Sequence, residues 1–238
     1  MTAVIGYGNL IDTATLGGTV TNAANLQDRY LAHKASAGAG SYLDIDLGST
    51  KSIGVVAVVA HTQASGTIRV QGGSSAGSGS AYDSTALAIY SGSDYAITFT
   101  PVSARYWRIT FSAASTFGRV FIGPRFKPAT NMDWNPSFAR ESRSVIGEAL
   151  SGMEFGDKRS SRRVWRGAFS WLTPDEADEF GTIQEDSDIV DEVYWIEEES
   201  DVTYRGKRWF LGRFRQLSPI EYPYLNTHTV GVEIGELL

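Results

Sequence analysis

The sequence contains one pentapeptide that matches the nucleophile motif of many hydrolases. Gly73-Ser74-Ser75-Ala76-Gly77 follows the pattern Gly-x-Ser-x-Gly, in which a turn from strand to helix exposes the serine hydroxyl for attack on a carbonyl carbon. A strand-like segment precedes this motif, but no helical pattern follows it. Residues 72–80 are all Gly, Ser or Ala, so composition alone produces the match. We therefore expect a flexible surface loop here.

Two carboxylates, Asp44 and Asp46, also have a spacing that suits chemistry. They lie in segment 42–47, which alternates apolar and acidic residues, so they share one face of a predicted strand. Such a pair can act as acid and base or bind calcium. An acidic solvent face of a half-buried strand explains the same pattern, and we favour this explanation. We assign no metal ligand and expect no cofactor.

The remaining candidate groups do not form a catalytic constellation. His33, His61 and His228 lack the short spacing of a metal-binding pair, and there is no cysteine to supply a nucleophile, a disulfide or a thiolate ligand. The sequence has neither a Walker loop nor a dinucleotide-binding fingerprint. We therefore predict that the protein is not an enzyme.

Charge and hydropathy argue against several protein classes. The net charge of −6 argues against a protein that coats nucleic acid, and we expect no sequence-specific nucleic-acid binding. The longest apolar run, residues 53–60, is far shorter than the about 20 residues of a membrane-spanning helix. Residues 1–20 lack the basic segment of a secretory signal. We expect no membrane association.

The charge is divided unevenly along the chain. Residues 1–127 contain nine Lys or Arg, six Asp and no Glu, whereas residues 128–238 contain twelve Lys or Arg and twenty-one acidic residues. Such a shift in composition predicts two domains with different solvent faces. We place the boundary between 1–127 and 128–238, because Pro128 disfavours a continuous helix or central strand there.

The first domain is predicted to be a β-sandwich. Its segments alternate apolar and polar residues or are β-branched, Gly-rich turns separate them, and none has a convincing helical period. The predicted strands are 42–47, 53–60, 67–71, 96–99, 105–111 and 119–122.

Three of these segments resemble discoidin-type, galactose-binding-like jelly rolls. Leu43-Asp44-Ile45-Asp46-Leu47-Gly48 is similar to their hydrophobic-x-Val-Asp-Leu-Gly strand, Ile68-Arg69-Val70 to the strand before a Ser-x-Asp-Gly turn, and residues 101–109 to a late strand. The resemblance implies a jelly roll whose loops bind sugars or lipid headgroups, and it leaves a structural calcium open. The candidate sugar-stacking residues are Tyr30, Tyr82, Tyr90 and Tyr95, for which a role at a protein interface fits as well.

The second domain is predicted to be α+β, with one helix on a mostly antiparallel sheet. A strand over 164–172 leads into a helix that has Thr173 as its N-cap, Pro174 at its first position and Glu176 completing a capping box. The predicted strands that follow are 190–196, 208–215 and 228–234.

This element order resembles the tail-tube-like split barrel of long-tailed bacteriophages, and residues 210–221 are similar to segments of phage minor tail proteins. A tube-like barrel beside a carbohydrate-binding-like domain is similar to the plan of distal tail proteins of the baseplate or tail tip. The resemblance implies a structural virion protein that forms a homo-oligomeric ring, expected to be a hexamer, between the tail tube and the tail-tip hub. It implies the tail tube, hub and tape measure proteins as partners, possible contact with a host surface glycan, and assembly in the host cytoplasm. The alternative is a carbohydrate-binding adhesin or receptor-binding module.

Two clusters of opposite charge are candidates for the interface of such a ring. A basic cluster on one subunit can meet an acidic segment on the next, and this heterologous contact repeats around a closed cycle. The candidate interface residues are Arg159, Arg162, Arg163, Glu197, Glu198 and Glu199.

Overall fold

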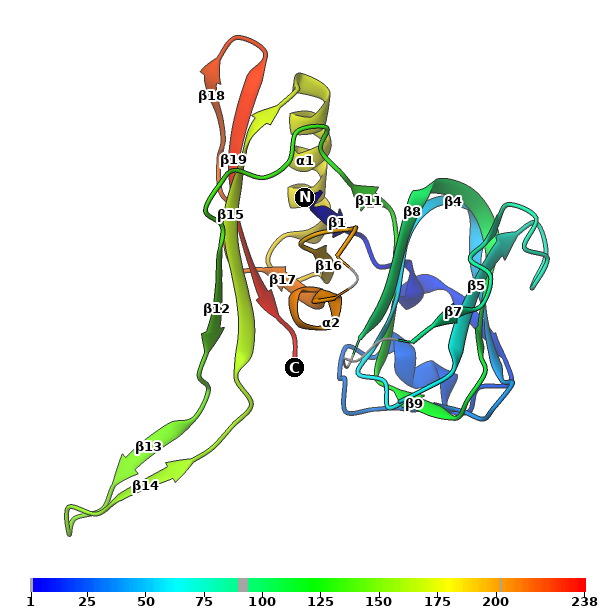
Figure 1. Cartoon of the computed structure of the whole chain (residues 1–238), viewed down its shortest axis with the longest axis horizontal. Coiled ribbons are helices and arrows are strands. Elements are labelled where there is room, and N and C mark those ends of the chain that lie inside the picture. The colour runs from blue at the N-terminus through cyan, green and yellow to red at the C-terminus, as the bar shows by residue number, and fades with distance from the viewer. Residues whose placement is uncertain (1, 90–93, 202) are drawn as a thin grey trace. The chain divides into compact units, whose positions relative to one another are not determined.

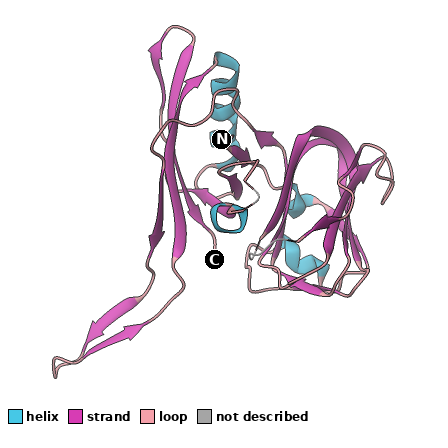
Figure 2. Ribbon diagram, viewed as in Figure 1, coloured by secondary structure: helices cyan, strands magenta, loops and turns pink. Residues whose placement is uncertain are grey.

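The computed structural model describes residues 2–89, 94–201 and 203–238, and most of its regular structure is β-strand (Figure 1; Figure 2). The chain forms two compact units. The first comprises Met1–Lys127 and Glu192–Leu211, and the second comprises Pro128–Asp191 and Gly212–Leu238. The prediction of a mainly β protein is confirmed.

The first unit is built from many strands and a few short helical turns. Two 3-10 turns, Leu10–Thr13 and Ala23–Gln27, and the four-residue helix α2 (Arg205–Arg208) are its helical elements among the described residues. Its strands are β1 (Val4–Gly6), β2 (Thr15–Gly18), β3 (Ala35–Ala37), β4 (Tyr42–Val59), β5 (Thr67–Gly73), β6 (Tyr82–Asp83), β7 (Leu87–Ala88), β8 (Tyr95–Phe111), β9 (Ser115–Phe117), β10 (Arg119–Gly123), β11 (Arg125–Phe126) and β16 (Val193–Ile196).

Two long bent strands, β4 and β8, supply both layers of a sandwich (Figure 1). The first half of β4 and the second half of β8 lie with β2 and β5, while the second half of β4 pairs with β10. We predicted two separate strands in each of β4 and β8. The structure joins them, because the register shifts between Asp46 and Lys51 and Gly48 adopts a φ of 73° that lets the strand bend.

One apolar core lies between the two layers. Leu43 and Ile45 from the first half of β4 belong to the same buried cluster as Val56 and Val58 from its second half, together with Trp107 of β8. The alternation in segment 42–47 predicts that Leu43, Ile45 and Leu47 face inward; Leu43 and Ile45 are buried in this core, and Leu47 is partly buried against it. The prediction of a β-sandwich is confirmed.

The segment Glu192–Leu211 belongs to the first unit, although we placed all of 128–238 in the second domain. Strand β16 pairs antiparallel with β1, which pairs on its other side with β11. Glu192, which is 3% exposed, also accepts hydrogen bonds from buried Arg119. The domain prediction did not include the return of Glu192–Leu211 to the first unit. Strand pairing between residues almost 200 positions apart leaves no local signal in composition.

The second unit is an antiparallel sheet covered by one helix. Residues of β17 pair with β19, β19 pairs with β15, and β15 pairs with β12, while β18 also pairs with β19. The elements are β12 (Ser137–Glu141), β13 (Val145–Glu148), β14 (Glu154–Asp157), β15 (Arg162–Leu172), α1 (Pro174–Ser187), β17 (Phe210–Phe214, divided between the units after Leu211), β18 (Ile220–Tyr224) and β19 (Thr227–Glu236).

Helix α1 begins and packs as the sequence predicts. The Thr173 hydroxyl accepts a hydrogen bond from the Glu176 amide, and the Glu176 carboxylate accepts one from the Thr173 amide. Phe180 on its buried face contacts Phe214 of β17 edge to face, with 6.2 Å between ring centroids. The predicted α+β character of this unit is confirmed, and the tube-like barrel stays a prediction.

A two-stranded hairpin extends from this sheet beyond β12 and β15 (Figure 1). We call residues 145–157 the arm. Its strands β13 and β14 pair only with each other among the described strands. Its large apolar side chains are more than half exposed, namely those of Val145, Ile146, Leu150, Met153 and Phe155.

The described helices are all short or polar, and none has the length and apolar character needed to cross a membrane.

Candidate functional site

The first unit has a polar pocket of about 450 Å³ where β4 and β8 bend. We call it the bend pocket. The loop between β5 and β6 forms one of its walls, and the bends of β4 and β8 form the others. Its lining residues are Thr50, Gly73, Ser74, Ser80, Ala81, Ser103, Ala104, Arg105 and Tyr106.

Arg105 is fixed at the edge of this pocket by an ion pair. Its Nε and a terminal nitrogen donate to the two carboxylate oxygens of Asp46 at 2.6 and 2.8 Å. These hydrogen bonds lower the pKa of Asp46. The Arg105 guanidinium lies 4.8 Å from the centre of the Tyr106 ring. The pocket therefore presents hydroxyls, an oriented guanidinium and an aromatic ring, a set of groups that suits a saccharide.

The carboxylate pair Asp44 and Asp46 has a structural role. Each carboxylate binds one arginine of β8 in a two-pronged ion pair, and Arg108 bonds Asp44 at 2.6 and 2.8 Å. Arg108 also stacks on the Tyr42 ring at 4.0 Å. Nowhere in the described residues do three or more His, Asp or Glu side chains gather in a way that could hold a metal ion.

The Gly-x-Ser-x-Gly motif lies in the loop between β5 and β6, where strand follows strand and no helix begins. It therefore lacks the strand-to-helix turn of a nucleophile motif. A Cβ atom on Gly73 would lie 1.8 Å from the Ser78 hydroxyl, so glycine is required for this loop to close onto β5.

An ion pair between Arg69 of β5 and Asp83 of β6 holds the end of this loop. The Arg69 guanidinium donates to the Asp83 carboxylate, with Nε at 2.9 Å from Oδ1, and lowers the pKa of Asp83 from 3.8 to about 2. Because the pKa is lower in the folded state, this pair stabilises the fold fully above about pH 4. The stabilisation disappears as the pH falls towards 2.

We expect the Asp83→Asn variant to lose about 1 kcal/mol or less of unfolding free energy at pH 6, because the pair is partly exposed. The difference from the unchanged protein should shrink to near zero at pH 2, where Asp83 is half protonated in the fold. Urea unfolding followed by circular dichroism at several pH values measures this. A difference that is the same at pH 6 and pH 2 would contradict the role of the ion pair.

Three of the four predicted sugar-stacking tyrosines lie in the described part of the chain, and their surroundings differ. Tyr95 is 3% exposed and part of the core, and burial raises its pKa. Tyr82 is half-buried and stacks on Phe99 at 3.8 Å between centroids. Tyr30 is exposed beside His33. Tyr90 lies outside the described residues. The aromatic residue in the bend pocket is Tyr106, which the sequence analysis placed only as part of a strand.

The predicted basic interface residues differ in exposure. Arg159 is exposed next to the arm. Arg162 is partly exposed, and its Nε donates to Glu141 at 2.7 Å. Arg163 is 6% exposed, and its backbone amide donates to Glu236 at 2.7 Å, so it does not reach the surface.

The predicted acidic interface residues have partners within their own unit. Glu197 lies 3.4 Å from Arg208, and burial raises its pKa. Glu198 accepts a hydrogen bond from Ser200 at 2.8 Å. Glu199 binds Lys127 at 2.5 Å. These three side chains therefore already have polar contacts inside the chain.

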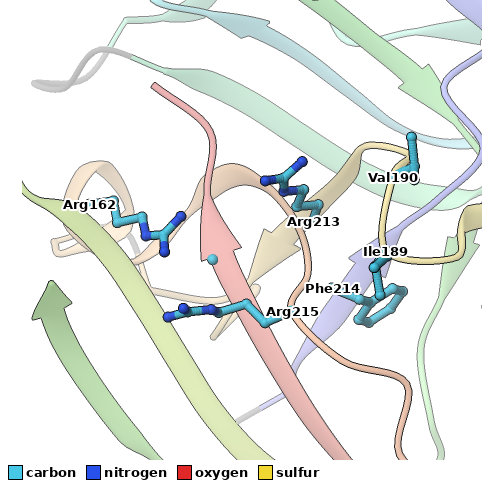
Figure 3. A pocket seen from close by; sticks show the side chains of 7 residues that line it. Arg162, Ile189, Val190, Arg213, Phe214 and Arg215 are labelled. Carbon is cyan, nitrogen blue, oxygen red and sulfur yellow. The ribbon is translucent and has the colours of Figure 1, made fainter. Parts of the chain in front are cut away.

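A second pocket, of about 290 Å³, lies in the second unit (Figure 3). We call it the arginine pocket. Figure 3 shows the side chains of Arg162, Arg213 and Arg215 around strand β19. Three guanidinium groups around one pocket can bind a carboxylate or phosphate group of a ligand. The lining residues are Arg162, Ile189, Val190, Arg213, Phe214, Arg215 and Gly235. The basic cluster predicted Arg162 as an interface residue, whereas no sequence pattern pointed to Arg213 and Arg215.

The second unit also exposes apolar side chains at the end opposite the arm, around the turn between β18 and β19 (Figure 1). We call this group the hairpin-tip cluster. It consists of Trp171, Tyr222, Tyr224 and Leu225, each at least 60% exposed.

Comparison with protein-family models gave no match. Comparison with curated proteins gave none either.

Several solved structures are similar to part of the chain. The lectin domain of lectinolysin complexed with Lewis B antigen has a TM-score of 0.39 and 13% identity, over 49% of this chain and 96% of that chain. The CBM32 of AlyQ, in complex with 4,5-unsaturated mannuronic acid, has a TM-score of 0.38 and 21% identity, over 51% and 97%. SpGH29 has a TM-score of 0.41 and 17% identity over 49% of this chain, which spans only 28% of SpGH29.

Proposed function

We propose that this chain is a structural subunit of a homo-oligomeric ring, formed by its second unit, at the distal end of a long-tailed bacteriophage tail. The observation that carries the proposal is the arm, which exposes large apolar side chains and pairs with no other described strand. An isolated two-stranded hairpin is marginally stable in water, and clustered exposed apolar side chains mark interaction sites. A neighbouring protein surface that covers the arm would therefore stabilise it.

The distribution of apolar side chains favours contact between copies of this chain. The arm and the hairpin-tip cluster lie at opposite ends of the second unit and consist of different residues. Two different patches favour a head-to-tail contact over a self-complementary one. Repeated head-to-tail contacts form a ring when the rotation between copies closes.

The order of elements in the second unit supports placing this ring in a phage tail. Strand β15, the capped helix α1 and then several strands ending in β19 come in the order of the tail-tube-like barrels that the sequence resembles. In this proposal the ring, expected to be a hexamer, joins the tail tube to the tail-tip hub and contacts the tape measure protein. The first unit is an appended module of the virion.

The oligomeric state tests this proposal. Light scattering coupled to size exclusion, at several micromolar concentrations, should give a mass of several protomers, and negative-stain images should show annular particles. A monomer at every concentration, both alone and mixed with a tail tube protein, overturns the proposal.

A second candidate function, glycan binding by the first unit, is favoured by the bend pocket. Its hydroxyls, Arg105 and Tyr106 can bond sugar hydroxyls and pack on a sugar ring. On a glycan array we expect binding that the Tyr106→Ala variant weakens at least about tenfold, because the aromatic contact is lost. The Tyr30→Ala variant, which changes an exposed tyrosine outside the pocket, should bind as the unchanged protein does. Absence of binding on the array, or equal binding by both variants, contradicts this function.

A further inference from the structure

The arginine pocket contains more positive charge than the chain neutralises. Arg162 and Arg215 share Glu141, at 2.7 and 2.8 Å. Arg166 bonds Glu233 at 3.0 Å, and Arg215 lies 3.5 Å from the same carboxylate. The Arg213 side chain is exposed and makes no hydrogen bond or ion pair with any residue that the structure describes. Three guanidiniums of the pocket and the neighbouring Arg166 therefore share two carboxylates.

The wall of the pocket beside these charges is apolar. Phe214 is buried, and Ile189 and Val190 are 44% and 59% exposed. Gly235 lines the pocket on β19, and a Cβ atom there would lie 3.2 Å from the Arg215 side chain, so glycine keeps the space open. A ligand that fits this pocket combines carboxylates with an apolar side chain.

The arm has this combination on one face. Glu148 of β13 lies directly opposite Glu154 of β14, and neither carboxylate has a partner in the described part of the chain. Like charges directly opposite across two strands destabilise a hairpin. Ile146 lies two residues before Glu148, on the same face, and is 74% exposed.

We propose that the face of the arm with Ile146, Glu148 and Glu154 binds in the arginine pocket of a neighbouring copy of this chain. In this contact the two carboxylates meet Arg213 and its neighbouring guanidiniums, and Ile146 packs on Ile189 and Val190. The unpaired charges of each surface are then neutralised by the other. The inference rests on the proposed ring, for which it defines the contact between subunits.

Charge reversal tests the contact. The Glu148→Arg/Glu154→Arg variant and the Arg213→Glu variant change exposed side chains without ion pairs in the fold, so both should fold normally, as thermal unfolding by circular dichroism checks. Each should weaken assembly at least about tenfold in protein concentration. Lys51→Glu, which changes the charge of the first unit by as much as Arg213→Glu changes that of the second, should leave assembly unchanged.

Mixing the two reversed variants provides the decisive measurement. In a head-to-tail contact, the reversed arm meets the carboxylate introduced at position 213, in a pocket whose net positive charge is gone, and the natural arm meets the natural pocket. The mixture should therefore assemble with the two variants alternating, although each alone does not. Reversed variants that assemble like the unchanged protein, or a mixture that stays monomeric, overturn this contact while the ring itself stands. If the unchanged protein is a monomer, the proposed ring fails and the contact fails with it.

Discussion

Replacing the apolar side chains of the arm should convert the assembled protein into a folded monomer. We expect this of the variant with serine in place of Val145, Ile146, Met153 and Phe155. Full burial of one such side chain contributes about 1.5–3 kcal/mol, so losing four contacts should weaken assembly by at least about 1,000-fold. Light scattering over a concentration series measures the change.

The fold should survive these four substitutions because the side chains are exposed. The thermal unfolding temperature of the variant should therefore lie close to that of the unchanged protein when both are measured at a concentration too low for assembly. A matched control replaces Tyr30 and Leu87, two exposed apolar residues of the first unit, with serine and should assemble normally. Assembly that persists in the arm variant would show that the ring is built through another surface.

The second large effect is expected at Arg119, which is completely buried in the first unit. Its guanidinium bonds Glu192 at 2.9 Å and the carbonyl oxygen of Leu26 at 2.5 Å. Asn9 donates to the same Glu192 carboxylate at 2.8 Å. The Arg119→Met variant leaves that carboxylate buried without its cation, so we expect a loss of about 3–5 kcal/mol of unfolding free energy.

Urea unfolding gives this value, and a double variant identifies its cause. Arg119→Met combined with Glu192→Leu removes both charges and should be markedly more stable than Arg119→Met alone. The exposed pair supplies a control, because Arg69→Met should cost much less than Arg119→Met. A loss below about 1 kcal/mol at Arg119 would show that water or another cation compensates Glu192.

Elements with a local signature could be predicted from the sequence. The alternation around Leu43 and Ile45 predicted a half-buried strand, and the structure buries both side chains. Thr173 and Glu176 predicted the start of α1, because a capping box satisfies backbone donors within three residues. Neither prediction depended on distant parts of the chain.

Features that depend on distant pairing were missed. The arm was not predicted, because its exposed side chains do not alternate against a core of the same chain. Tyr95 was taken for a surface tyrosine, although it lies in a long strand that the core covers. The bend pocket was missed for a similar reason. Residues 50, 73–81 and 103–106 meet only because two strands bend at the same level.

The discontinuous first unit has a consequence for folding during synthesis. Strand β1 can pair with β11 early, but its other edge stays unpaired until the residues of β16 leave the ribosome, after most of the second unit has been made. Until then Arg119 also lacks the buried carboxylate of Glu192. The first unit therefore completes late, and a chain that ends at Lys127 should expose an open strand edge and aggregate. Because the chain is made from its N-terminus, the first unit cannot be completed before the segment Glu192–Leu211 has been synthesised.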